Sequence, residues 1–529
     1  MASVAAAGAV DVLGRGGGLL PLRVSPLLRY SVLPLLVAGL TSLLSALLGL
    51  LDGDYVYSVE LGGWGLGFLA AGLAWLAVTR PSRSLTREGV LVLVAAAWLL
   101  VPLFSAIPVA AVMGLPFLDV WFESISGFTT TGLSVFTGGV DPAYGVYLPR
   151  VEELPWSVLW WRAVTQWLGG FGVVVLFYTL ARLGGLPAHL VGAAEGRFER
   201  LEPSISKSLR ALMGLYLTLT GFGTLLLYSA GMGASDALYH TMTGLATGGF
   251  STHSSSIGFY RSVAVEAAVI VVMVIGASNF ADLYALLRGA PRRFSREIET
   301  MIALMALNSL LGYLLLRASG WNPVGPLRNA VFHIVSAMSG TGFGIVDLSE
   351  APSSFKLLLT AAMITGGSAF STTGGIKMYK VMIILKSVLW SIQETIYGKA
   401  RISVPRVGGY RVDESELKRA IAVTFLFVAV LLAGAFAITL VDPRINALDA
   451  LFEAQSALCT VGLSVGITHA ATPPAIKLIL MALMTLGRLE VIGFLYAAAA
   501  AARLFSATRA VKRAAPLRLA RRPWEAAMP

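Results

Sequence analysis

Charged residues and cysteine are both scarce in this sequence. Asp, Glu, Lys and Arg together make up 13% of its 529 residues, whereas hydrophobic residues make up 56%, and the mean hydropathy is +0.76. Ordinary soluble domains are about one quarter charged, so this composition excludes them and indicates an integral membrane protein. The single cysteine, Cys459, excludes an intrachain disulfide. The fold is therefore expected to depend on packing alone.

Acidic residues are fewer than basic ones, and the formal net charge is +11. Such an excess could indicate nucleic-acid binding, but the basic residues gather in alternate connections between apolar segments, within 80–87, 197–210, 288–296, 399–419 and 503–522. The other connections are mostly acidic or neutral. By the positive-inside rule, we expect a multi-pass protein of the cytoplasmic membrane, embedded in the lipid bilayer, with both termini cytoplasmic and no nucleic-acid partner.

Long apolar runs are abundant. A membrane-spanning helix needs about 20 apolar residues, and candidate spans lie near 28–51, 64–79, 89–113, 155–183, 209–231, 258–288, 297–316, 354–392, 417–440 and 473–503. The pattern predicts an all-α polytopic membrane protein with about ten transmembrane helices.

A thirteen-residue pattern occurs four times in the non-basic connections. The copies are F-E-S-I-S-G-F-T-T-T-G-L-S from Phe122, Y-H-T-M-T-G-L-A-T-G-G-F-S from Tyr239, F-H-I-V-S-A-M-S-G-T-G-F-G from Phe332 and F-E-A-Q-S-A-L-C-T-V-G-L-S from Phe452. Each has Glu or His one residue after the aromatic, Ser or Thr four after, and Gly ten after. Asp or Asn stands three residues before each aromatic. The repetition predicts four equivalent structural units.

The spacing within each copy suggests a short helix that enters the membrane without crossing it. Asp or Asn is a preferred N-cap, and the next ten or so residues make a helix of about 15 Å, half of the hydrocarbon thickness. The following Gly allows the backbone to turn successive carbonyls toward one axis, as in the T-V-G-Y-G loop of potassium channels. We therefore predict four helix/half-helix/filter-loop/helix repeats around one pseudo-fourfold pore. The loop residues expected to bind K⁺ are Thr130, Thr131, Gly132, Leu133, Thr247, Gly248, Gly249, Phe250, Gly340, Thr341, Gly342, Phe343, Thr460, Val461, Gly462 and Leu463.

Other polar residues near these loops allow two interpretations. The Glu or His of each repeat could bind ions or sense pH, although hydrogen bonding to neighbouring backbone is the more common role for buried polar residues. Arg162 and Gln166 lie in an apolar helix, where polar groups are costly, and either pair with neighbours or contact the ion. An enzyme is a competing hypothesis, because Asp236, Ser251, His253 and Ser254 are close in sequence. Asp236 and Ser251 have equivalents in other repeats, however, and no G-x-S-x-G or H-E-x-x-H element occurs.

Three further motifs complete a family resemblance. They are W-R-A-V-T-Q-W-L-G-G-F-G from Trp161, G-G-S-A-F-S-T-T-G-G-I-K from Gly366 and L-G-R-L-E from Leu486. With the four repeats, they make residues 28 to 503 resemble the TrkH/KtrB/HKT superfamily of K⁺ and Na⁺ translocating proteins. Two additional helices before the first repeat match the TrkH branch. Gly132 stands where Na⁺-conducting plant relatives commonly have Ser, whereas Leu133 and Thr373 depart from the usual TrkH pattern.

The resemblance implies K⁺ uptake through a channel-like pore, with K⁺ as the transported ion. We expect no cofactor in this chain and no enzymatic activity. It also implies a homodimer with one pore per subunit and TrkA-like nucleotide-binding regulatory subunits on the cytoplasmic side. A Na⁺-permeable or Na⁺/H⁺-coupled transporter of the same superfamily is the alternative.

A gate is expected in the third repeat. A straight helix over 354–392 would be roughly 58 Å long, about twice the hydrocarbon thickness, so it is expected to break in the Gly-, Ser- and Thr-rich stretch. We hypothesise a flexible loop that obstructs ions below the filter, against the alternative of a static kink. Its candidate residues are Gly366, Gly367, Ser368, Ser371, Thr372, Thr373, Gly374, Gly375 and Lys377.

Arg488 completes the expected gate. It lies about 22 Å along the final apolar span, where a guanidinium is costly unless it faces water or a partner. The resemblance puts this arginine beside the ion path, where its charge would form a barrier to cations. The alternative is an ion pair with another helix.

The sequence divides into seven expected regions. They are a cytoplasmic tail (1–27), two additional transmembrane helices (28–88), repeat 1 (89–183), a cytoplasmic linker with repeat 2 (184–289), repeat 3 with the interrupted gating helix (290–398), a cytoplasmic linker with repeat 4 (399–504) and a basic cytoplasmic tail (505–529).

Overall fold

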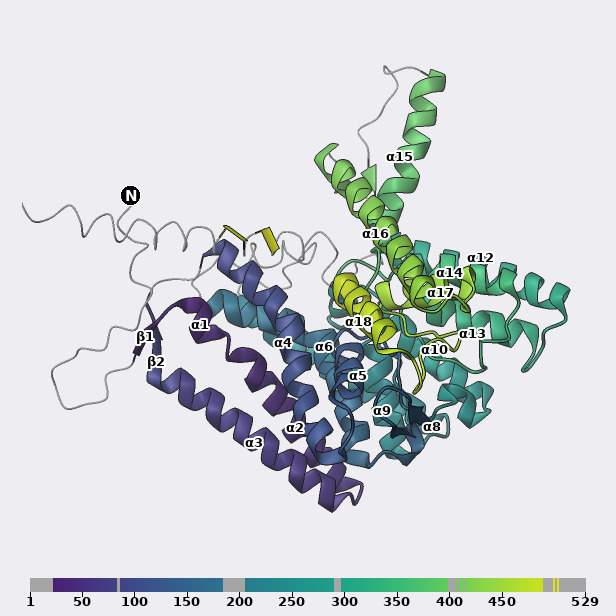
Figure 1. The fold of residues 1–529 in the computed structure, drawn as a ribbon. Helices are drawn as coiled ribbons and strands as arrows, with labels where there is room; N and C mark the ends of the chain where they lie inside the picture. The colour runs from purple at the N-terminus through teal and green to yellow at the C-terminus, as the bar shows by residue number, and fades with distance from the viewer. Residues whose placement is uncertain are drawn as a thin grey trace, which may run out of the picture.

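The computed structural model describes residues 22–82, 86–183, 205–289, 296–397, 406–407, 410–412, 414–488, 498–499 and 502–503. Helices dominate these ranges, as Figure 1 shows. Both expected tails fall wholly or mainly outside the described residues. So does the part of the final span after Arg488, apart from two residue pairs.

Six helices in the described part of the chain are long and apolar enough to cross a membrane, or seven if one bent pair counts as a single span. The longer helices are α2 (Leu33–Leu51), α3 (Tyr55–Val78), α4 (Arg87–Met113), α6 (Trp156–Leu183), α8 (Ile205–Ser229), α12 (Arg296–Ser319), α15 (Met378–Tyr397) and α16 (Glu414–Val441). The mostly helical fold expected from the sequence is therefore confirmed, with several apolar spans.

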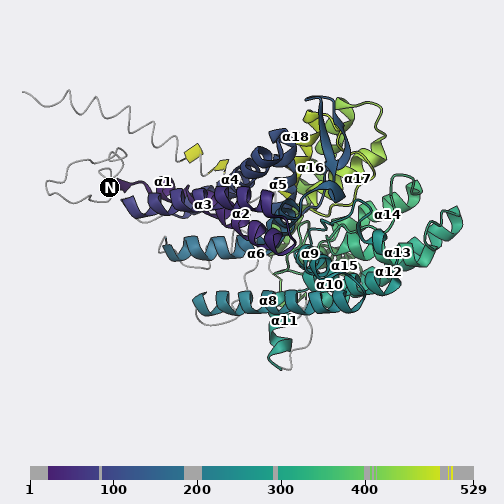
Figure 2. The same cartoon turned by 90° about the horizontal axis from the view of Figure 1, so that it is seen from below.

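The amino-terminal helices form a layer beside the rest of the molecule. The short helix α1 (Pro26–Tyr30) leads into α2, which packs along α3, and Figure 2 shows these helices together at one side. Helix α3 begins nine residues before the predicted start at residue 64, because Tyr55, Val56 and Tyr57 extend its apolar run. Strands β1 (Leu22–Val24) and β2 (Thr79–Pro81) pair in parallel at its far end.

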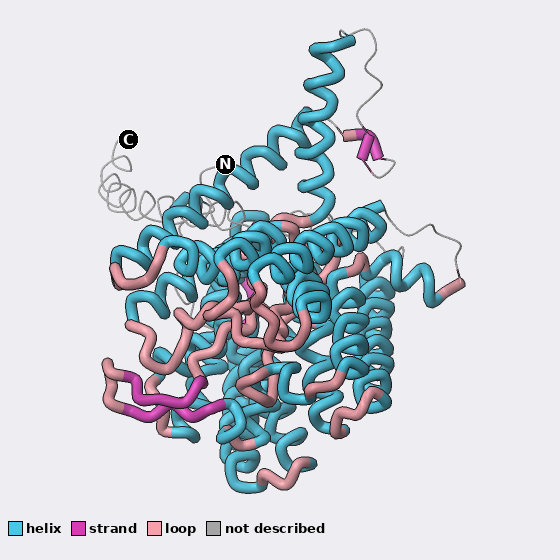
Figure 3. Tube along the Cα trace, turned by 90° about the vertical axis from the view of Figure 1, so that its right-hand side faces the viewer, coloured by secondary structure: helices cyan, strands magenta, loops and turns pink. Residues whose placement is uncertain are grey.

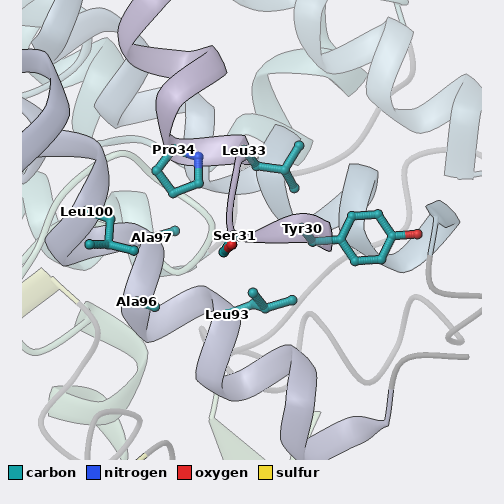
Figure 4. Close-up of a pocket in the computed structure, with 8 residues that line it drawn as sticks. All are labelled: Tyr30, Ser31, Leu33, Pro34, Leu93, Ala96, Ala97 and Leu100. Carbon is teal, nitrogen blue, oxygen red and sulfur yellow. The ribbon is translucent and has the colours of Figure 1, made fainter. Parts of the chain in front are cut away.

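A small apolar cavity of about 30 Å³ lies between this layer and α4. Figure 4 shows its walls, which come from the α1–α2 junction and from one face of α4. The lining residues are Tyr30, Ser31, Leu33, Pro34, Leu93, Ala96, Ala97 and Leu100. It is large enough for a water molecule, but its lining is almost entirely apolar, so we regard it as a packing defect.

Four short helices occupy the middle of the molecule. They are α5 (Phe117–Phe128), α9 (Ala234–Leu245), α13 (Pro326–Met338) and α17 (Ala447–Leu458), each with 12 or 13 residues. At 1.5 Å per residue they are about 18–20 Å long, too short to cross the hydrocarbon core. Figure 3 shows loops gathered in the middle of the surrounding helices.

The predicted N-caps of these short helices are wrong. The caps are Pro116, Gly233, Gly325 and Asn446. The repeated Asp or Asn lies about one turn later, inside the helix, because the helices begin three or four residues earlier than expected. A carboxylate in the first turn still faces the positive end of the helix dipole, which is why the sequence pattern resembles a cap.

Two predicted spans are broken. Residues 258–288 contain the 3₁₀ turn η2 (Ser256–Tyr260), α10 (Val263–Ala277) and α11 (Phe280–Leu287), and the two helices meet at 106°. Asn279 caps α11 at this bend. Residues 354–392 contain α14 (Ser353–Ile364) and α15, which are separated by residues 365–377. We call this segment the interrupting loop.

The remaining elements lie at the two ends of the bundle. Strands β3 (Thr137–Asp141) and β4 (Val146–Arg150) form an antiparallel hairpin that continues into the 3₁₀ turn η1 (Val151–Glu153). Strands β5 (Arg406–Val407) and β6 (Tyr410–Arg411) form a smaller hairpin between α15 and α16. In Figure 1, α15 and the start of α16 project from the main body. Helix α18 (Pro474–Arg488) completes the fourth repeat.

Candidate functional site

The loops that follow the four short helices meet in one closed ring. A Cβ added to Gly132 would lie 2.1 Å from the Gly248 carbonyl oxygen, and one added to Gly249 would lie 1.9 Å from the Thr341 oxygen. Gly342 faces the Val461 oxygen at 1.9 Å, and Gly462 faces the Thr131 oxygen at 2.1 Å. Each central glycine thus abuts a carbonyl of the next repeat, and the last repeat closes on the first. We call Thr130–Leu133, Thr247–Phe250, Gly340–Phe343 and Thr460–Leu463 the loop ring.

The backbone of each loop alternates in handedness. The first residue has a positive φ, between 52° and 67°, and so does the central glycine, between 72° and 96°. The residue between them does not. This alternation turns successive carbonyls to the same side of the chain. Thr130, Thr247 and Thr460 are β-branched residues in a region that such residues rarely adopt, and strain of this kind persists only where the surroundings impose it.

Glutamates of the short helices hold two of the loops. The Glu123 carboxylate accepts hydrogen bonds from the Ser134 hydroxyl and the Val135 N–H, both at 2.7 Å. Glu453 does the same for Ser464 and Val465 in repeat 4. The chain after each loop therefore returns alongside its own short helix.

Two levels of the ring are distinguished. We call the level of the first loop residues the lower level, and the side on which the short helices begin the upper side.

Histidines occupy the same position in the other two repeats. His240 Nε2 lies 2.9 Å from the Ser251 hydroxyl, and His333 Nε2 accepts a hydrogen bond from the Ile345 N–H at 3.4 Å. Their Nδ1 atoms lie within hydrogen-bonding distance of carbonyls in the preceding helical turn. These contacts match the structural interpretation of the repeated Glu or His, namely bonding to neighbouring groups.

The repeated serine, four residues after the aromatic, contacts the loop directly in three repeats. Ser126 and Ser456 accept hydrogen bonds from the N–H groups of Gly132 and Gly462 at 3.0 Å. Ser336 donates to the Phe343 carbonyl at 2.7 Å. Polar side chains thus fix the backbone amides without occupying the space enclosed by the ring.

Helix α6 supplies two side chains that join repeat 1 to repeat 2. The buried Arg162 donates to Glu123 at 3.1 Å, to the Ser134 hydroxyl at 3.1 Å and to the Ser251 carbonyl at 3.0 Å. Gln166, one turn further along, contacts the second loop. The sequence marked both residues as unusual in an apolar helix, but it did not identify these partners.

The interrupting loop lies directly below the ring. The Thr372 hydroxyl is 3.2 Å from that of Thr247, and a Cβ on Gly340 would lie 3.6 Å from the Thr373 Cβ. Gly374 packs so closely on Thr460 that a Cβ would lie 2.1 Å from the threonine hydroxyl. The segment expected to act as the gate therefore contacts the lower level of three of the four loops.

Further contacts hold the interrupting loop in place. Thr372 Oγ1 lies 3.0 Å from the carbonyls of Leu245 and Gly276. Lys377 Nζ donates to the Thr373 carbonyl and, at 3.0 Å, to its hydroxyl. Gly366 and Gly367 lie at the start of the loop, where their amides bond to Ile376 and Thr373, and Gly375 packs on Cys459.

Backbone amides of the interrupting loop also bond to helices of the second and third repeats. The Ser368 N–H donates to the Ala277 carbonyl at 2.9 Å, and the Ala369 N–H donates to Glu297 at 2.8 Å. Ser371 instead bonds within the loop, to the Ser368 carbonyl at 2.7 Å. The loop is therefore anchored through its backbone to α10 and α12.

Arg488 contacts the interrupting loop from the opposite side. Its guanidinium donates to the Thr372 carbonyl at 2.6 Å and to the Gly169 carbonyl of α6 at 3.0 Å. It also lies 5.5 Å from the centre of the Trp98 ring. One cation thus connects the first repeat, the third repeat and the last described helix, immediately below the ring.

Ion pairs join neighbouring repeats on the upper side. Lys477 Nζ is 2.5 Å from Asp119 and 2.6 Å from Asp141, with all three side chains fully buried, and joins repeat 4 to repeat 1. Lys356 pairs with Asp449 at 2.9 Å between repeats 3 and 4. Glu266 pairs with Arg328 at 2.5 Å between repeats 2 and 3.

Three of the residues that would suit an enzyme lie together, but they do not form a catalytic triad. His253 Nε2 is 3.8 Å from the Asp236 carboxylate, whereas His253 reaches the Ser251 hydroxyl through its backbone N–H, at 3.1 Å, and not through its ring. Ser251 bonds to His240, Asp236 accepts a hydrogen bond from Thr252 at 2.7 Å, and Ser254 donates to Glu152 at 2.6 Å. Among the described residues there is also no group of three or more His, Cys, Asp or Glu able to hold a metal ion. The ring itself offers backbone oxygens, which suit an alkali cation as cargo.

Comparisons with known proteins agree with this architecture. The chain matches the family described as "TrkH: Cation transport protein" over residues 63–321 and 322–506. It is 32% identical to a cation transporter of Methanocaldococcus jannaschii, over 81% of this chain and 85% of the relative. It is 30% identical to the Trk system potassium uptake protein TrkH of Halomonas elongata, over 88% of this chain and 96% of the relative.

The crystal structure of the potassium transporter TrkH from Vibrio parahaemolyticus is also similar, with a TM-score of 0.74 and 25% identity. The similarity covers 88% of this chain and 98% of that one. Together, the four-loop ring, the apolar spans and these relatives establish that the chain belongs to the TrkH family of membrane-embedded cation transport proteins.

Proposed function

We propose that this protein takes up K⁺ across the cytoplasmic membrane, down its electrochemical gradient, through the loop ring. The observation that carries the proposal is that each central glycine abuts a carbonyl of the neighbouring loop. No side chain fits there, so the backbone oxygens of four loops can replace the hydration shell of an ion. Relatives named as potassium uptake proteins support K⁺ as the cargo.

The dipoles of the four short helices also favour cations over anions at the ring. The carboxyl ends of four short helices point to the lower level of the ring, and each carries partial negative charge. A cation there is stabilised and an anion is repelled. The positive-inside pattern of the sequence assigns the upper side to the exterior. K⁺ therefore enters at the upper side of the ring, which we call the rim, and leaves toward the interrupting loop.

The interrupting loop is the proposed gate. It contacts the lower level of three loops and obstructs the exit until it is displaced. Arg488 adds a positive charge below the ring and holds the loop through the Thr372 carbonyl. We propose that TrkA-like nucleotide-binding subunits on the cytoplasmic side displace the loop, and that the protein works as a homodimer with one pore per subunit.

The test is ion-resolved flux in vesicles that contain the purified protein, with and without the regulatory subunit. K⁺ uptake that exceeds Na⁺ uptake, and rises when the regulatory subunit is added, is expected. Equal K⁺ and Na⁺ fluxes would overturn the assignment of selectivity, and the absence of any cation flux would overturn the function.

Deleting residues 369–371 from the interrupting loop tests the gate separately. Basal flux without the regulatory subunit should rise, because a shortened loop cannot cover the exit. Unchanged or lost flux in a well-folded deletion variant would show that the loop is a static kink.

A further inference from the structure

The second loop differs from the other three at one position. The residue before the central glycine is Thr131 in repeat 1, Thr341 in repeat 3 and Val461 in repeat 4, but Gly248 in repeat 2. The side chains of Thr131 and Thr341 each lie 2.8 Å from the hydroxyl of the residue that caps the preceding short helix, Thr129 or Ser339. Val461 is fully buried. Three loops are thus braced by a side chain that the second loop lacks.

The space of the missing side chain is filled by Gln166 of α6. A Cβ added to Gly248 would lie 2.4 Å from the Gln166 Cδ, 2.6 Å from its Oε1 and 2.7 Å from its Nε2. Non-bonded contacts of a Cβ essentially never are this short, and all three involve the same amide group. With Gln166 in this conformation, position 248 has no room for a side chain. A positive φ is not the reason for the glycine, because the φ of Gly248 is not positive.

The same amide makes two hydrogen bonds that bracket the central glycine. Its Nε2 donates to the Gly248 carbonyl at 2.6 Å, and its Oε1 accepts from the Phe250 N–H at 3.1 Å. Gln166 is fully buried, so water cannot replace these bonds. The Gly248 oxygen is also the atom that faces Gly132 across the first corner of the ring.

We propose that Gln166 is a specificity-determining positioning residue. Its side-chain amide takes the place of the side chain missing at Gly248, and it holds the second loop at the spacing that distinguishes K⁺ from Na⁺. This inference rests on the proposed function, because it assigns a role in ion selection. It requires no contact between Gln166 and the ion.

Three variants test the proposal in the same vesicle assay. Gln166→Met keeps the volume but removes both hydrogen bonds, and a buried polar group left unpaired costs enough to lower the K⁺/Na⁺ permeability ratio about tenfold, equal to ~1.4 kcal/mol. Gly248→Val collides with the glutamine and should lose selective flux. Gln166→Ala with Gly248→Val rebuilds the second loop as T-V-G-F, like T-V-G-L in repeat 4, and should recover at least half of the lost selectivity.

The permeability ratio of the folded Gln166→Met protein is the readout that a merely structural role would not change. Recovery in the double variant tests whether a side chain at position 248 can replace the glutamine, because residues in contact are not additive. The matched control is Gln455→Met. Gln455 is a buried glutamine in α17 whose amide contacts Cys459 and not a loop carbonyl, so its variant should keep the wild-type ratio.

A folded Gln166→Met protein with the wild-type permeability ratio would overturn the inference, and so would a double variant no better than its worse parent. Wild-type protein without K⁺ flux would instead reject the proposed function. If Gln166→Met does not fold, the double variant still decides, because selective flux must return when the valine is present.

Discussion

The corner between repeats 1 and 2 differs from the other three corners of the ring. In the other corners, the fourth residue of an outer helix makes an ion pair with the next repeat on the upper side: Lys477 of α18, Lys356 of α14 and Glu266 of α10. Leu159 occupies the equivalent position in α6. At this corner, Arg162 and Gln166, about one and two turns further along α6, connect repeat 1 to repeat 2.

This difference shows that the backbone of the ring has pseudo-fourfold symmetry, whereas the side chains that join neighbouring repeats do not. All four corners have the same contact between a glycine and a carbonyl, within 0.2 Å. Three corners have an ion pair on the upper side, and the fourth is joined closer to the loops by Arg162 and Gln166. The ring geometry is thus the shared requirement, and different side chains satisfy it.

The largest expected effect comes from the contact that all corners share. Gly132→Ser or Gly462→Ser would place a Cβ 2.1 Å from a carbonyl oxygen, and the loop must shift. We expect the K⁺/Na⁺ permeability ratio to fall at least tenfold in both variants, because a displacement of the carbonyls removes ligands that K⁺ needs. Ion-resolved flux in vesicles measures the ratio.

The control for these glycines is Gly344→Ala, two residues beyond Gly342. A Cβ there meets its nearest atom at 3.6 Å and needs no positive φ, so selectivity should not change. An unchanged ratio in both serine variants would show that the ring does not select ions.

The next effect is on stability, and it compares a corner that has an ion pair at the rim with the corner between repeats 1 and 2, which lacks one. Lys477→Met leaves Asp119 and Asp141 buried without their cation, and loss of one partner from a buried ion pair costs about 3–5 kcal/mol. The melting temperature of the purified protein should fall markedly. Leu159→Met, at the matching position of α6, conserves volume and should cost less than about 1.5 kcal/mol. Equal losses would mean that the rim ion pairs do not stabilise the corners.

A smaller change is expected below the ring. Arg488→Ala removes a positive charge and the hydrogen bond to Thr372, so K⁺ conductance should rise several-fold without the regulatory subunit. Arg488→Lys keeps the charge and should change conductance less. A folded Arg488→Ala protein with wild-type or lower conductance would indicate a purely structural role.

The smallest effect concerns Glu152 of the 3₁₀ turn η1, which contacts Ser254 at the corner between repeats 1 and 2. Burial raises the pKa of Glu152, but hydrogen bonds from the Ser254 N–H and hydroxyl outweigh it and hold this pKa below its usual range. A lowered pKa stabilises the fold above about pH 4.5, and this stability is lost as the pH falls through the folded-state pKa.

Because Glu152 lies at the surface, its contribution should be under about 1 kcal/mol. Melting temperatures between pH 7 and pH 4 should therefore fall slightly less steeply in Glu152→Gln and in Ser254→Ala than in the wild type. Identical pH profiles in all three proteins would show that the contact is not stabilising.

The sequence predicts what depends on local pattern and length. The four repeats were visible because Gly132, Gly249, Gly342 and Gly462 follow an aromatic residue at constant spacing. The division of 354–392 into α14 and α15 follows from its length, and the composition of 366–375 places the division. Such features need no knowledge of the neighbours in space.

Long-range contacts could not be predicted in this way. Asp119 was expected to be an N-cap, but it is buried beside Lys477, which is 358 residues away in the chain. The continuous apolar run over 258–288 predicts a single span, whereas the structure bends between α10 and α11, where Asn279 caps α11. Gln166 was conspicuous for its polarity in an apolar helix, but its partner Gly248 is 82 residues away.

The most direct test of the central claim is a structure of the protein determined in Rb⁺ or Tl⁺, in which the anomalous signal of the ion locates bound cations. A peak on the axis of the ring, within contact distance of carbonyl oxygens from all four loops, is the predicted result. The same peak should disappear in Na⁺ and weaken in Gly132→Ser. Cations bound only at the acidic residues of the rim, with none inside the ring, would contradict the account.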